Sequence, residues 1–395
     1  MKKIILKAGK EKSLLRRHPW VYSGAISRVE GYPANGDTVQ VQTNQGVFLA
    51  HAAYHSQAPI AARVWSWRQD EPIDDAFFYR KLAHALALRQ DLHLSQSSKA
   101  FRLVHGESDS LPGLVIDQYD RVLVIQIGSV GAERWRDTIL NILKELCDPV
   151  CIYERSDTDV RELEGLASRT GVLWGELPND LVIEEYGLKF AVDVVAGQKT
   201  GFYLDQRNNR AKIRTLAKGK AVLNCFCYSG GFSVYAKQGG ASSILSIDSS
   251  NTALKLAQHN FALNQLDSDS LEWQCADVFQ MLRKLRDQNR KFDLIILDPP
   301  KFAPTASFAA KAARGYKDIN LLAFKLLRPD GLLATYSCSS GISSELFQKI
   351  IAGAALDAGV NAHIIDQQIA APDHPVLLSF PEGAYLKGLL LRVAD

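Results

Sequence analysis

The first 75 residues alternate between apolar and polar positions in short runs. Residues 39–42 alternate, residues 44–46 form a turn pattern with a glycine, and residues 47–50 return as a second run. Residues 61–67 form a further run with bulky side chains. Several short strands separated by glycine-containing turns are typical of a small barrel. We therefore predict a β-barrel domain over residues 1–75.

A different pattern follows up to residue 185. Apolar residues recur at helical spacing between residues 74 and 94, and shorter strand-like and helical runs come after them. The expected strands and helix of this part are residues 113–117, 122–127, 132–146 and 150–153. Together they predict a small central α+β domain over residues 76–185.

From residue 186 onward, apolar strand-like runs alternate with helical patterns. The runs are Ala221–Cys225, Ser243–Asp248, Phe292–Leu297 and residues 332–336. This alternation predicts a parallel sheet covered by helices, and therefore an α/β domain over residues 186–395. Residues 376–380 and 386–393 are expected to form a hairpin that closes the domain.

The composition is that of an ordinary globular protein, with 47% hydrophobic and 23% charged residues among 395. No apolar run approaches the ~20 residues of a membrane-spanning helix, and the first residues lack the apolar stretch of a signal peptide. We therefore expect a cytoplasmic protein without a membrane partner. The six cysteines have no Cys-x-x-Cys spacing. We therefore expect no metal site and interpret them as mostly reduced, buried residues.

Positive charge is concentrated near the start of the chain. Residues 1–30 carry eight Lys or Arg against two Glu, a local excess of six positive charges. Such a patch attracts phosphate backbones, which makes Lys12, Arg16 and Arg17 candidate RNA-binding residues, with Trp20 as a stacking surface. On charge alone, an ordinary solvated basic face is an equal alternative.

In the last domain, residues suited to a nucleotide-like cofactor follow the expected strands. The first strand leads to Asn224, Phe226, Tyr228 and Gly230, and a glycine here permits close approach of the backbone. The second strand ends at Asp248, 24 residues after Asn224, where a carboxylate can hold two ribose hydroxyls. The alternative role of Asp248 is that of a helix N-cap.

Two further segments complete the pattern. Asp277-Val278 offers an acid that can face an adenine amino group, and Asp298-Pro299-Pro300 follows the third apolar strand. Two consecutive prolines cannot continue a sheet ladder, so Asp298 is expected on a rigid edge. The four segments, in this order, resemble the motifs of class I Rossmann-like methyltransferases, which implies S-adenosylmethionine as the cofactor. The first motif departs from that family, because Asn-Cys-Phe-Cys-Tyr-Ser-Gly-Gly replaces its acidic, glycine-alternating pattern.

Cys338 lies just after the strand expected at residues 332–336, next to the strand that delivers Asp298. C5 of a pyrimidine is a poor nucleophile, and a thiolate that adds to C6 activates it. Asp298 can then hydrogen-bond N3 and stabilise the adduct. We therefore interpret Cys338 and Asp298 as catalytic residues, while a small strand-end residue is the alternative for Cys338.

The whole chain also resembles the large-subunit ribosomal RNA cytosine-C5 methyltransferases. The matching strings are residues 11–21, 106–109, 199–207, 298–302, 314–318 and 381–383. The resemblance implies a PUA-like barrel that binds RNA, a small central domain, a catalytic domain, 23S ribosomal RNA as the substrate and Cys338 as the nucleophile. It also implies that Gln206 and Arg207 line the cofactor or substrate side of the site.

Other interpretations stay open at this point. Arg314 and Lys317 are candidate RNA contacts near the catalytic edge, with ordinary helix-surface charge as an equal alternative. The same fold can methylate a guanine or adenine nitrogen without a covalent step, or it can serve as an inactive RNA-binding assembly factor. The sequence does not decide between naked RNA and a partly assembled subunit, and it leaves a homodimer open.

Overall fold

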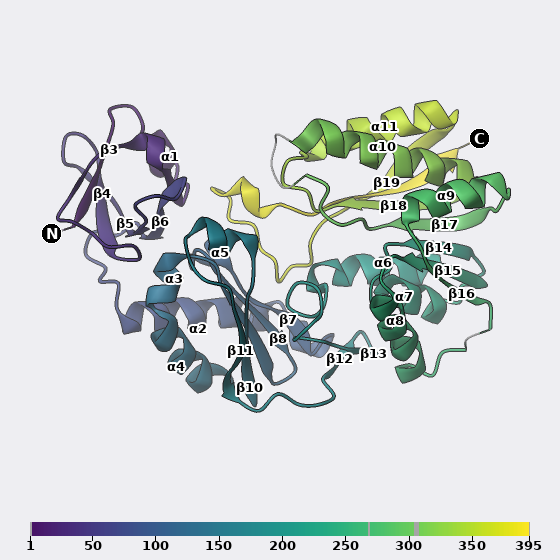
Figure 1. Ribbon diagram of the computed structural model, residues 1–395, viewed down its shortest axis with the longest axis horizontal. Coiled ribbons are helices and arrows are strands. Elements are labelled where there is room, and N and C mark those ends of the chain that lie inside the picture. Colours follow the sequence, from purple (N-terminus) through teal and green to yellow (C-terminus); the bar gives the residue numbers. More distant parts are fainter. Residues whose placement is uncertain (1, 268, 304–307, 395) are drawn as a thin grey trace. The chain divides into compact units, whose positions relative to one another are not determined.

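The computed structural model describes residues 2–267, 269–303 and 308–394. They divide into two compact units, and each contains more than one segment of the chain (Figure 1). The first unit comprises Met1–Glu184, Val192–Leu204 and Pro372–Gly383, and the second comprises Glu185–Ala191, Asp205–Ala371 and Ala384–Asp395.

The first part of unit 1 is a six-stranded sheet with the order β2-β6-β5-β4-β1-β3. Val39 and Val41 face the core and pair with Ala52 and Ala50 across the β4–β5 hairpin, as the alternating pattern predicts. A short helix, α1 (Lys12–Leu15), precedes β2. The strands are β1 (Lys3–Leu6), β2 (Trp20–Tyr22), β3 (Ile26–Glu30), β4 (Thr38–Gln42), β5 (Phe48–Tyr54) and β6 (Ile60–Ser66).

The second part of unit 1 is a five-stranded sheet with the order β11-β10-β9-β8-β7. Asp74 begins the long helix α2, because its carboxylate accepts a hydrogen bond from Phe77 N at 2.9 Å. The two edge strands, β7 and β11, were not expected from the sequence. The strands are β7 (Ala100–His105), β8 (Leu114–Tyr119), β9 (Val122–Ile127), β10 (Cys151–Ser156) and β11 (Arg169–Gly175). The helices are α2 (Asp75–Asp91), α3 (Val130–Arg134), α4 (Arg136–Cys147) and α5 (Asp159–Leu163).

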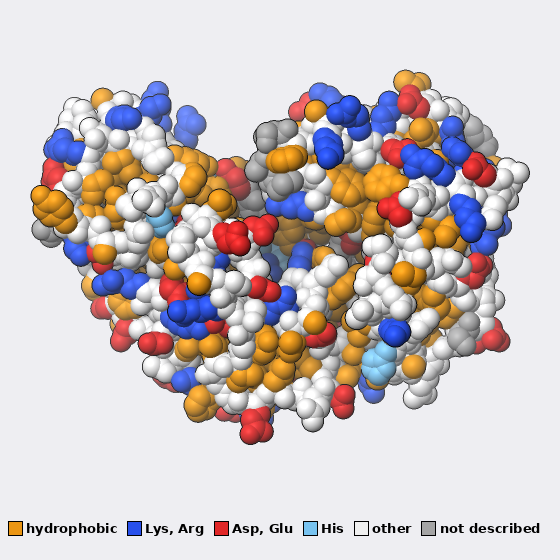
Figure 2. Space-filling model, in the orientation of Figure 1, with side chains coloured by type: hydrophobic (Ala, Val, Ile, Leu, Met, Phe, Trp, Pro, Cys, Tyr) orange, Lys and Arg blue, Asp and Glu red, His pale blue; other side chains and the backbone are white. Residues whose placement is uncertain are grey.

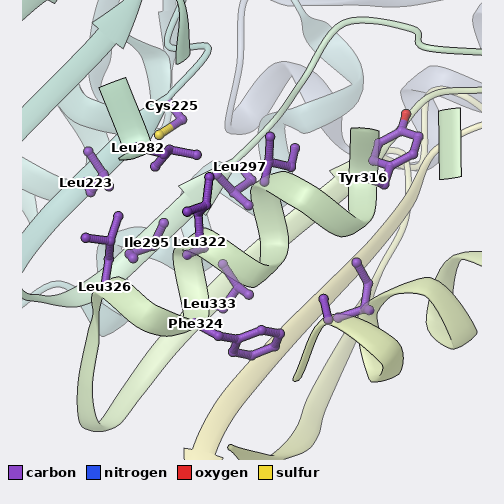
Figure 3. Close-up of a cluster of buried hydrophobic side chains, with 14 of the residues drawn as sticks. Leu223, Cys225, Leu282, Ile295, Leu297, Tyr316, Leu322, Phe324, Leu326 and Leu333 are labelled. Atoms are coloured by element: carbon purple, nitrogen blue, oxygen red, sulfur yellow. The ribbon is translucent and has the colours of Figure 1, made fainter. Parts of the chain in front are cut away.

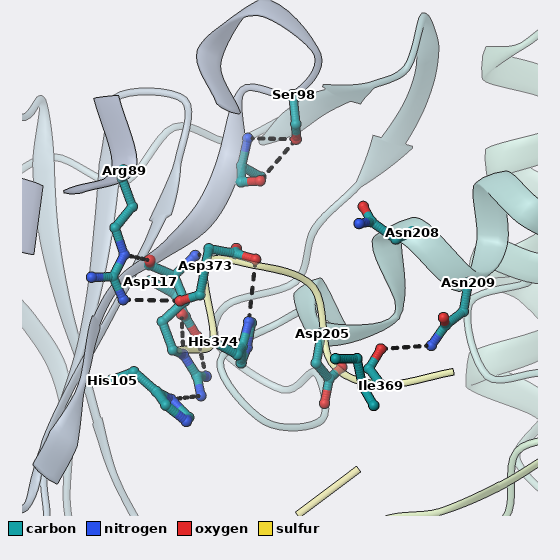
Figure 4. A network of polar contacts seen from close by, with 12 residues as sticks. Arg89, Ser98, His105, Asp117, Asp205, Asn208, Asn209, Ile369, Asp373 and His374 are labelled. Atoms are coloured by element: carbon teal, nitrogen blue, oxygen red, sulfur yellow. Dashed lines mark hydrogen bonds and ion pairs between the residues drawn. The ribbon is translucent and has the colours of Figure 1, made fainter. Parts of the chain in front are cut away.

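A buried polar network joins the last segment of unit 1 to the central sheet (Figure 4). Arg89 donates to both carboxylate oxygens of Asp109, at 2.7 and 2.9 Å, and to the carbonyl oxygen of Asp373 at 2.9 Å. Arg102 N donates to the Asp373 carboxylate at 2.8 Å. Buried charges are tolerated when they are paired and hydrogen-bonded, so these contacts hold Pro372–Gly383 on unit 1.

Unit 2 is built on a seven-stranded sheet with the order β16-β15-β14-β17-β18-β20-β19. The first five strands of this order are parallel and β20 is antiparallel to both of its neighbours. The strands are β14 (Ala221–Cys225), β15 (Ser243–Asp248), β16 (Leu271–Cys275), β17 (Phe292–Leu297), β18 (Leu327–Ser337), β19 (Asn361–Gln368) and β20 (Lys387–Ala394). The expected strands at β14, β15 and β17 have these same bounds.

Helices cover both faces of this sheet, with α6, α7 and α8 on one face and α9, α10 and α11 on the other (Figure 1). Their bounds are α6 (Arg207–Leu216), α7 (Gly231–Gln238), α8 (Asn251–Leu263), α9 (Val278–Asp287), α10 (Ala309–Leu326) and α11 (Ser344–Ala358). A short ribbon of β12 (Val182–Glu185) and β13 (Leu188–Ala191) precedes α6.

The core of unit 2 lies between the central strands and α9 to α11 (Figure 3). Ile295, Leu297 and Leu333 from neighbouring strands pack with Leu322 and Leu326 of α10, and all five are at most 3% exposed. Strands covered on both faces are continuous apolar runs, which explains why the sequence marked them so clearly.

The expected closing hairpin is wrong in its first strand. Residues 376–380 form no strand, and the antiparallel partners of β20 are β18 and β19. Val376 and Leu378 are exposed, and Leu377 N donates to Ser108 Oγ at 3.3 Å. The apolar residues of this segment therefore belong to a loop of unit 1, where Phe380 packs against the ring of Trp20.

Candidate active site

The loop between β14 and α7 has an unusual backbone. Phe226, Tyr228 and Gly230 have φ values of 59°, 45° and 75°. A left-handed conformation is uncommon and strained for residues other than glycine, and such strain often occurs at binding sites. Tyr228 N donates to Asp248 Oδ2 at 2.9 Å. The loop is therefore tied to the end of the neighbouring strand β15.

Gly230 is required by packing as well as by conformation. A Cβ at this position would lie 2.7 Å from the Cβ of Ala257 in α8. Atoms at that separation overlap, so only glycine lets the start of α7 approach α8 this closely. This agrees with the close approach expected of the first motif.

Asp248 is held by two backbone amides at the carboxyl end of β15. Besides Tyr228 N, it accepts a hydrogen bond from Ser250 N at 2.9 Å through Oδ1. The N-cap of α8 is Ser250, whose hydroxyl accepts from Ala253 N at 3.2 Å. The N-cap alternative for Asp248 is therefore wrong. The half-buried carboxylate has lone pairs to spare for the hydroxyls of a ribose.

Asn224 and Gln206 lie inside the fold. The Asn224 side chain, 1% exposed, donates to Ser233 Oγ at 2.8 Å, within the contact between β14 and α7. Gln206, 2% exposed, accepts from Asn209 Nδ2 at 2.6 Å beside the start of α6. Arg207 is also fully buried. Asn224 and Gln206 therefore make hydrogen bonds inside the fold, next to this edge of the sheet.

Asp277 begins α9. Its carboxylate accepts from Gln280 N at 2.9 Å and is exposed, whereas Val278 is buried. An acid that caps a helix keeps its second oxygen for another donor. Asp277 can therefore serve both the helix and a bound amino group.

An apolar wall joins the first, third and fourth motifs. The ring of Phe226 lies 6.5 Å from the rings of both Phe279 and Phe302, and the latter two are 5.9 Å apart. The sequence analysis did not single out Phe279 or Phe302, because the rings meet only when the parallel strands end at one edge. An aromatic wall of this kind suits the flat face of an adenine.

Asp298 and Cys338 follow neighbouring strands at the same edge. Leu297 of β17 is the register partner of Thr335 in β18; Asp298 directly follows Leu297, and Cys338 comes three positions after Thr335. Both residues are half-buried. Burial, and then the charge of Asp298, raises the pKa of Tyr336 in β18. The structure thus places Asp298 and Cys338 after adjacent strands at one edge of the sheet.

Hydroxyl groups fix the backbone on both sides of Cys338. Ser337 Oγ donates to Tyr316 OH at 2.9 Å, and Tyr316 OH lies 2.9 Å from Ser339 Oγ. Ser339 Oγ also accepts from the backbone amides of Phe302 and Ala303, at 3.1 and 3.0 Å. The end of β18 is therefore bonded to α10 and to the segment after Pro300. Sequence reasoning missed this network, because it joins three distant segments.

The other cysteines are poor nucleophiles or lie elsewhere. Cys225 and Cys227 are buried, and burial raises the pKa of both thiols. Burial likewise raises the pKa of Cys147 to about 11. Cys275 is exposed at the end of β16. The interpretation of Cys225 and Cys227 as core residues is confirmed.

The basic residues expected to bind RNA have different surroundings. Lys12, Arg16 and Arg17 are exposed, and Figure 2 shows Lys and Arg side chains spread over the visible face of the barrel. The guanidinium of Arg17 lies over the Trp67 ring. Trp20 is half-buried, and its Nε1 donates to Glu107 at 2.8 Å, so it also joins the barrel to the central domain.

The two residues of α10 that were expected to bind RNA also differ in their surroundings. Arg314 is exposed, whereas Lys317 forms a 2.8 Å ion pair with Asp357 of α11. In the part of the chain that the structure describes, no group of three His, Cys, Asp or Glu side chains has the arrangement of a metal site. Across the same residues, no helix is both long and apolar enough to cross a bilayer.

Comparison with known proteins connects this geometry to a family. A family model described as S-adenosylmethionine-dependent methyltransferase matches residues 166–392, and a PUA-like domain model matches residues 4–67. Ribosomal RNA large subunit methyltransferase I of Tolumonas auensis is 51% identical over 391 residues, covering 98% of both chains. The protein of that name from Shewanella amazonensis is 50% identical over 392 residues, covering 99% of both chains.

Solved structures show the same fold. A candidate SAM-dependent methyltransferase from Streptococcus mutans aligns over 100% of both chains, with a TM-score of 0.86 and 24% identity. A candidate methyltransferase complexed with SAH aligns over the same shares, with a TM-score of 0.87 and 24% identity. The expected fold class, enzyme class and cofactor, S-adenosylmethionine, are confirmed. The chain belongs to the ribosomal RNA large subunit methyltransferase I family of S-adenosylmethionine-dependent methyltransferases.

Proposed function

We propose that this protein methylates C5 of a cytosine in 23S ribosomal RNA. The observation that carries the proposal is the placement of Cys338 and Asp298 after adjacent parallel strands, at the edge where the β14–α7 loop and Asp248 also lie. Relatives with 50–51% identity over nearly the whole chain are named for the RNA of the large ribosomal subunit, which supports the choice of substrate.

The residues at this edge fit S-adenosylmethionine. Gly230 leaves room where a Cβ would collide with α8, and Asp248 presents a carboxylate held by two amides. In the proposal, the backbone from Phe226 to Gly230 holds the methionine part, Asp248 binds the ribose, and Asp277 with Val278 binds the adenine. Gln206 and Asn224 support this arrangement from inside the fold. When bound, S-adenosylmethionine supplies an electrophilic methyl group.

Cys338 performs the covalent step of the proposed reaction. Its thiolate adds to C6 of the cytosine, and the electron pair of the C5–C6 bond moves toward C5 and N3. Cytosine N3 carries no hydrogen, so Asp298 in its protonated form donates a hydrogen bond to N3 and stabilises the negative charge of the adduct. After C5 has gained the methyl group, the C5 proton passes to water, the C5–C6 double bond forms again and the thiolate leaves. The target base must leave its stack to reach this edge.

The rest of the chain serves RNA binding in this proposal. We divide it into an RNA-binding barrel (1–75), a central domain (76–185) and a methyltransferase domain (186–395). Lys12, Arg16 and Arg17 contact the phosphate backbone, because they are exposed and carry the local positive charge. Trp20 is a further RNA contact of the barrel, and Arg314 and Lys317 are separate RNA contacts of the methyltransferase domain. The protein acts in the cytoplasm, on free 23S RNA or on a partly assembled subunit.

A trapping experiment with the full chain tests the proposal. The wild-type protein is expected to form a stable adduct with RNA that contains 5-fluorocytosine, whereas Cys338→Ser forms none and loses methylation. Cys147→Ser replaces a partly buried cysteine of α4 in unit 1 and is expected to keep both properties.

Two results would contradict the proposal in different ways. Full activity of Cys338→Ser would mean methylation of a base nitrogen without a covalent step. Absence of S-adenosylmethionine binding in calorimetry would mean an RNA-binding assembly factor instead. Mass spectrometry of ribosomal RNA from cells that lack the protein then identifies the nucleotide that loses its methyl group.

A further inference from the structure

Lys387 is a buried lysine next to the proposed nucleophile. It begins β20, where its register partner is Ser337 of β18, and it is 8% exposed. Its Nζ donates to the carbonyl oxygen of Ser339 at 2.7 Å. Lys387 therefore lies opposite Ser337, and its side chain extends to Ser339. These are the two residues on either side of Cys338.

A buried ammonium needs compensation. Transfer of a charge out of water is costly unless an opposite charge or hydrogen bonds replace the solvent. Among the residues that the structure describes, Cys338 and Lys301 are the charged groups that act on Lys387, and neither is an Asp or Glu. A carbonyl oxygen satisfies one of its three donors. The negative charge that acts on Lys387 at this end of β18 is that of the Cys338 thiolate.

The other titratable groups near Cys338 come from two parts of the chain. Lys301 follows β17, as does Asp298, and Tyr316 comes from α10. Burial lowers the pKa of Lys387 to about 8, while negative charge on Cys338 raises it and the charge of Lys301 lowers it. Burial also raises the pKa of Tyr316, with a further increase from Cys338. At pH 7 the tyrosine is therefore neutral and Lys387 is mostly protonated.

We propose that Lys387 is a positioning residue that keeps Cys338 ionised for attack on the base. This inference rests on the proposed function, in which Cys338 is the nucleophile. The thiol loses its proton to solvent, and the ammonium keeps its own proton throughout. An adjacent positive charge favours the thiolate over the thiol. The hydrogen bond to Ser339 holds the ammonium against the backbone of the residue that follows Cys338.

A role of Lys387 in stabilising the thiolate can be distinguished by experiment from a purely structural role. A lysine that only links β20 to β18 would affect stability, whereas one that holds a thiolate affects the pH at which Cys338 reacts. The rate of alkylation by iodoacetamide depends on the thiolate fraction, so its pH dependence gives the pKa of the thiol. Mass spectrometry of the Cys338 peptide measures this rate for one cysteine among six.

The experiment uses the full chain as wild type, Lys387→Met, Lys387→Arg and Lys349→Met. We expect a Cys338 pKa below the ~8.5 of an ordinary cysteine in the wild type. In Lys387→Met it rises by at least one unit, so alkylation at pH 7 slows about tenfold. Lys387→Arg keeps the positive charge and stays within a factor of about three of the wild-type rate. Lys349 is an exposed residue of α11 paired with Glu345, and its variant is expected to react like the wild type.

The outcomes separate this inference from the proposed function. A wild-type Cys338 pKa at or above ~8.5 would refute the inference, and this measurement needs no variant to fold. An unchanged pKa in Lys387→Met, or an equal rise in Lys387→Arg, would also refute it. If 5-fluorocytosine trapping succeeds while the pKa does not shift, only the role of Lys387 fails. If Cys338→Ser retains methylation, the proposed function fails regardless of the titration.

Discussion

Replacement of Gly230 by alanine tests how tightly the cofactor loop is packed. At this position φ is 75°, and the added Cβ would lie 2.7 Å from the Cβ of Ala257. Two separate costs follow from these values. An L-residue in the left-handed region costs about 1 kcal/mol, and an overpacked contact costs about 1–3 kcal/mol. We therefore expect Gly230→Ala to lower the free energy of unfolding by about 2–4 kcal/mol.

Gly219 provides a matched control for the first of these costs. Its φ of 71° is nearly the same, but an added Cβ there would meet no atom within 4 Å. Gly219→Ala should therefore cost only about 1 kcal/mol. Alanine also restricts the unfolded chain in both variants equally. The difference between the two variants, about 1–3 kcal/mol, isolates the contact between the loop and α8.

Urea denaturation of the three proteins measures these energies, with the midpoint and slope compared for each. Because a chain with two compact units need not unfold in one step, hydrogen exchange of the α7 and α8 amides gives the local free energy of opening as well. Values for Gly230→Ala and Gly219→Ala that agree within ~0.5 kcal/mol would refute the packing argument.

Two further substitutions test buried and half-buried charges of unit 2. Glu185→Gln is expected to destabilise the protein by about 3 kcal/mol, because buried Arg210 loses the carboxylate that it contacts at 2.8 and 2.9 Å; a loss below ~1 kcal/mol in urea denaturation would contradict this. Burial raises the pKa of Asp293, but hydrogen bonds from Ala221 N and Arg328 outweigh it and leave the pKa lowered. Its contribution is therefore complete above the ordinary pKa of ~3.9 and is lost as the pH falls toward the lower, folded-state value. Asp293→Asn should flatten the fall of the unfolding midpoint between about pH 5 and pH 3, and an unchanged slope would show that this carboxylate is not linked to stability.

The sequence predicted the centre of the sheet better than its edges. β14, β15 and β17 are buried on both faces, so each is a continuous apolar run that stops at a polar residue. The edge strand β16 has the sequence Leu-Glu-Trp-Gln-Cys, and none of its residues is fully buried. Such a strand leaves little trace in hydrophobicity, and β11 was missed for the same reason.

The wrong hairpin has another cause. Residues 376–380 are apolar enough for a strand, yet they pack or hydrogen-bond against residues far away in the sequence, such as Trp20 and Ser108. Periodicity along a chain does not report which distant surface a segment contacts. Besides β18, β20 pairs with β19, whose residues are largely exposed and show no clear hydrophobic pattern.

Some residues of the candidate site could be identified from the sequence, and others could not. Asp248 and Asp298 were identified because ligands bind where parallel strands end, and this position can be read from the sequence. Lys387 could not be identified, because its contact with Ser339 depends on the insertion of β20 antiparallel to β18. Side-chain direction was also hidden, since Asn224 precedes the cofactor loop but points into the contact with α7.

The return of Pro372–Gly383 to unit 1 has a consequence for biosynthesis. A ribosome makes the chain in order, so it completes almost all of unit 2 before this last piece of unit 1 exists. Until then, Arg89 has Asp109 but lacks the carbonyl oxygen of Asp373. Unit 1 therefore cannot reach its final form during its own synthesis. Unit 1 can complete its folding only after the segment between β19 and β20 has been synthesised. By then almost all of unit 2 has also been synthesised, so the two units complete their folding in the same period.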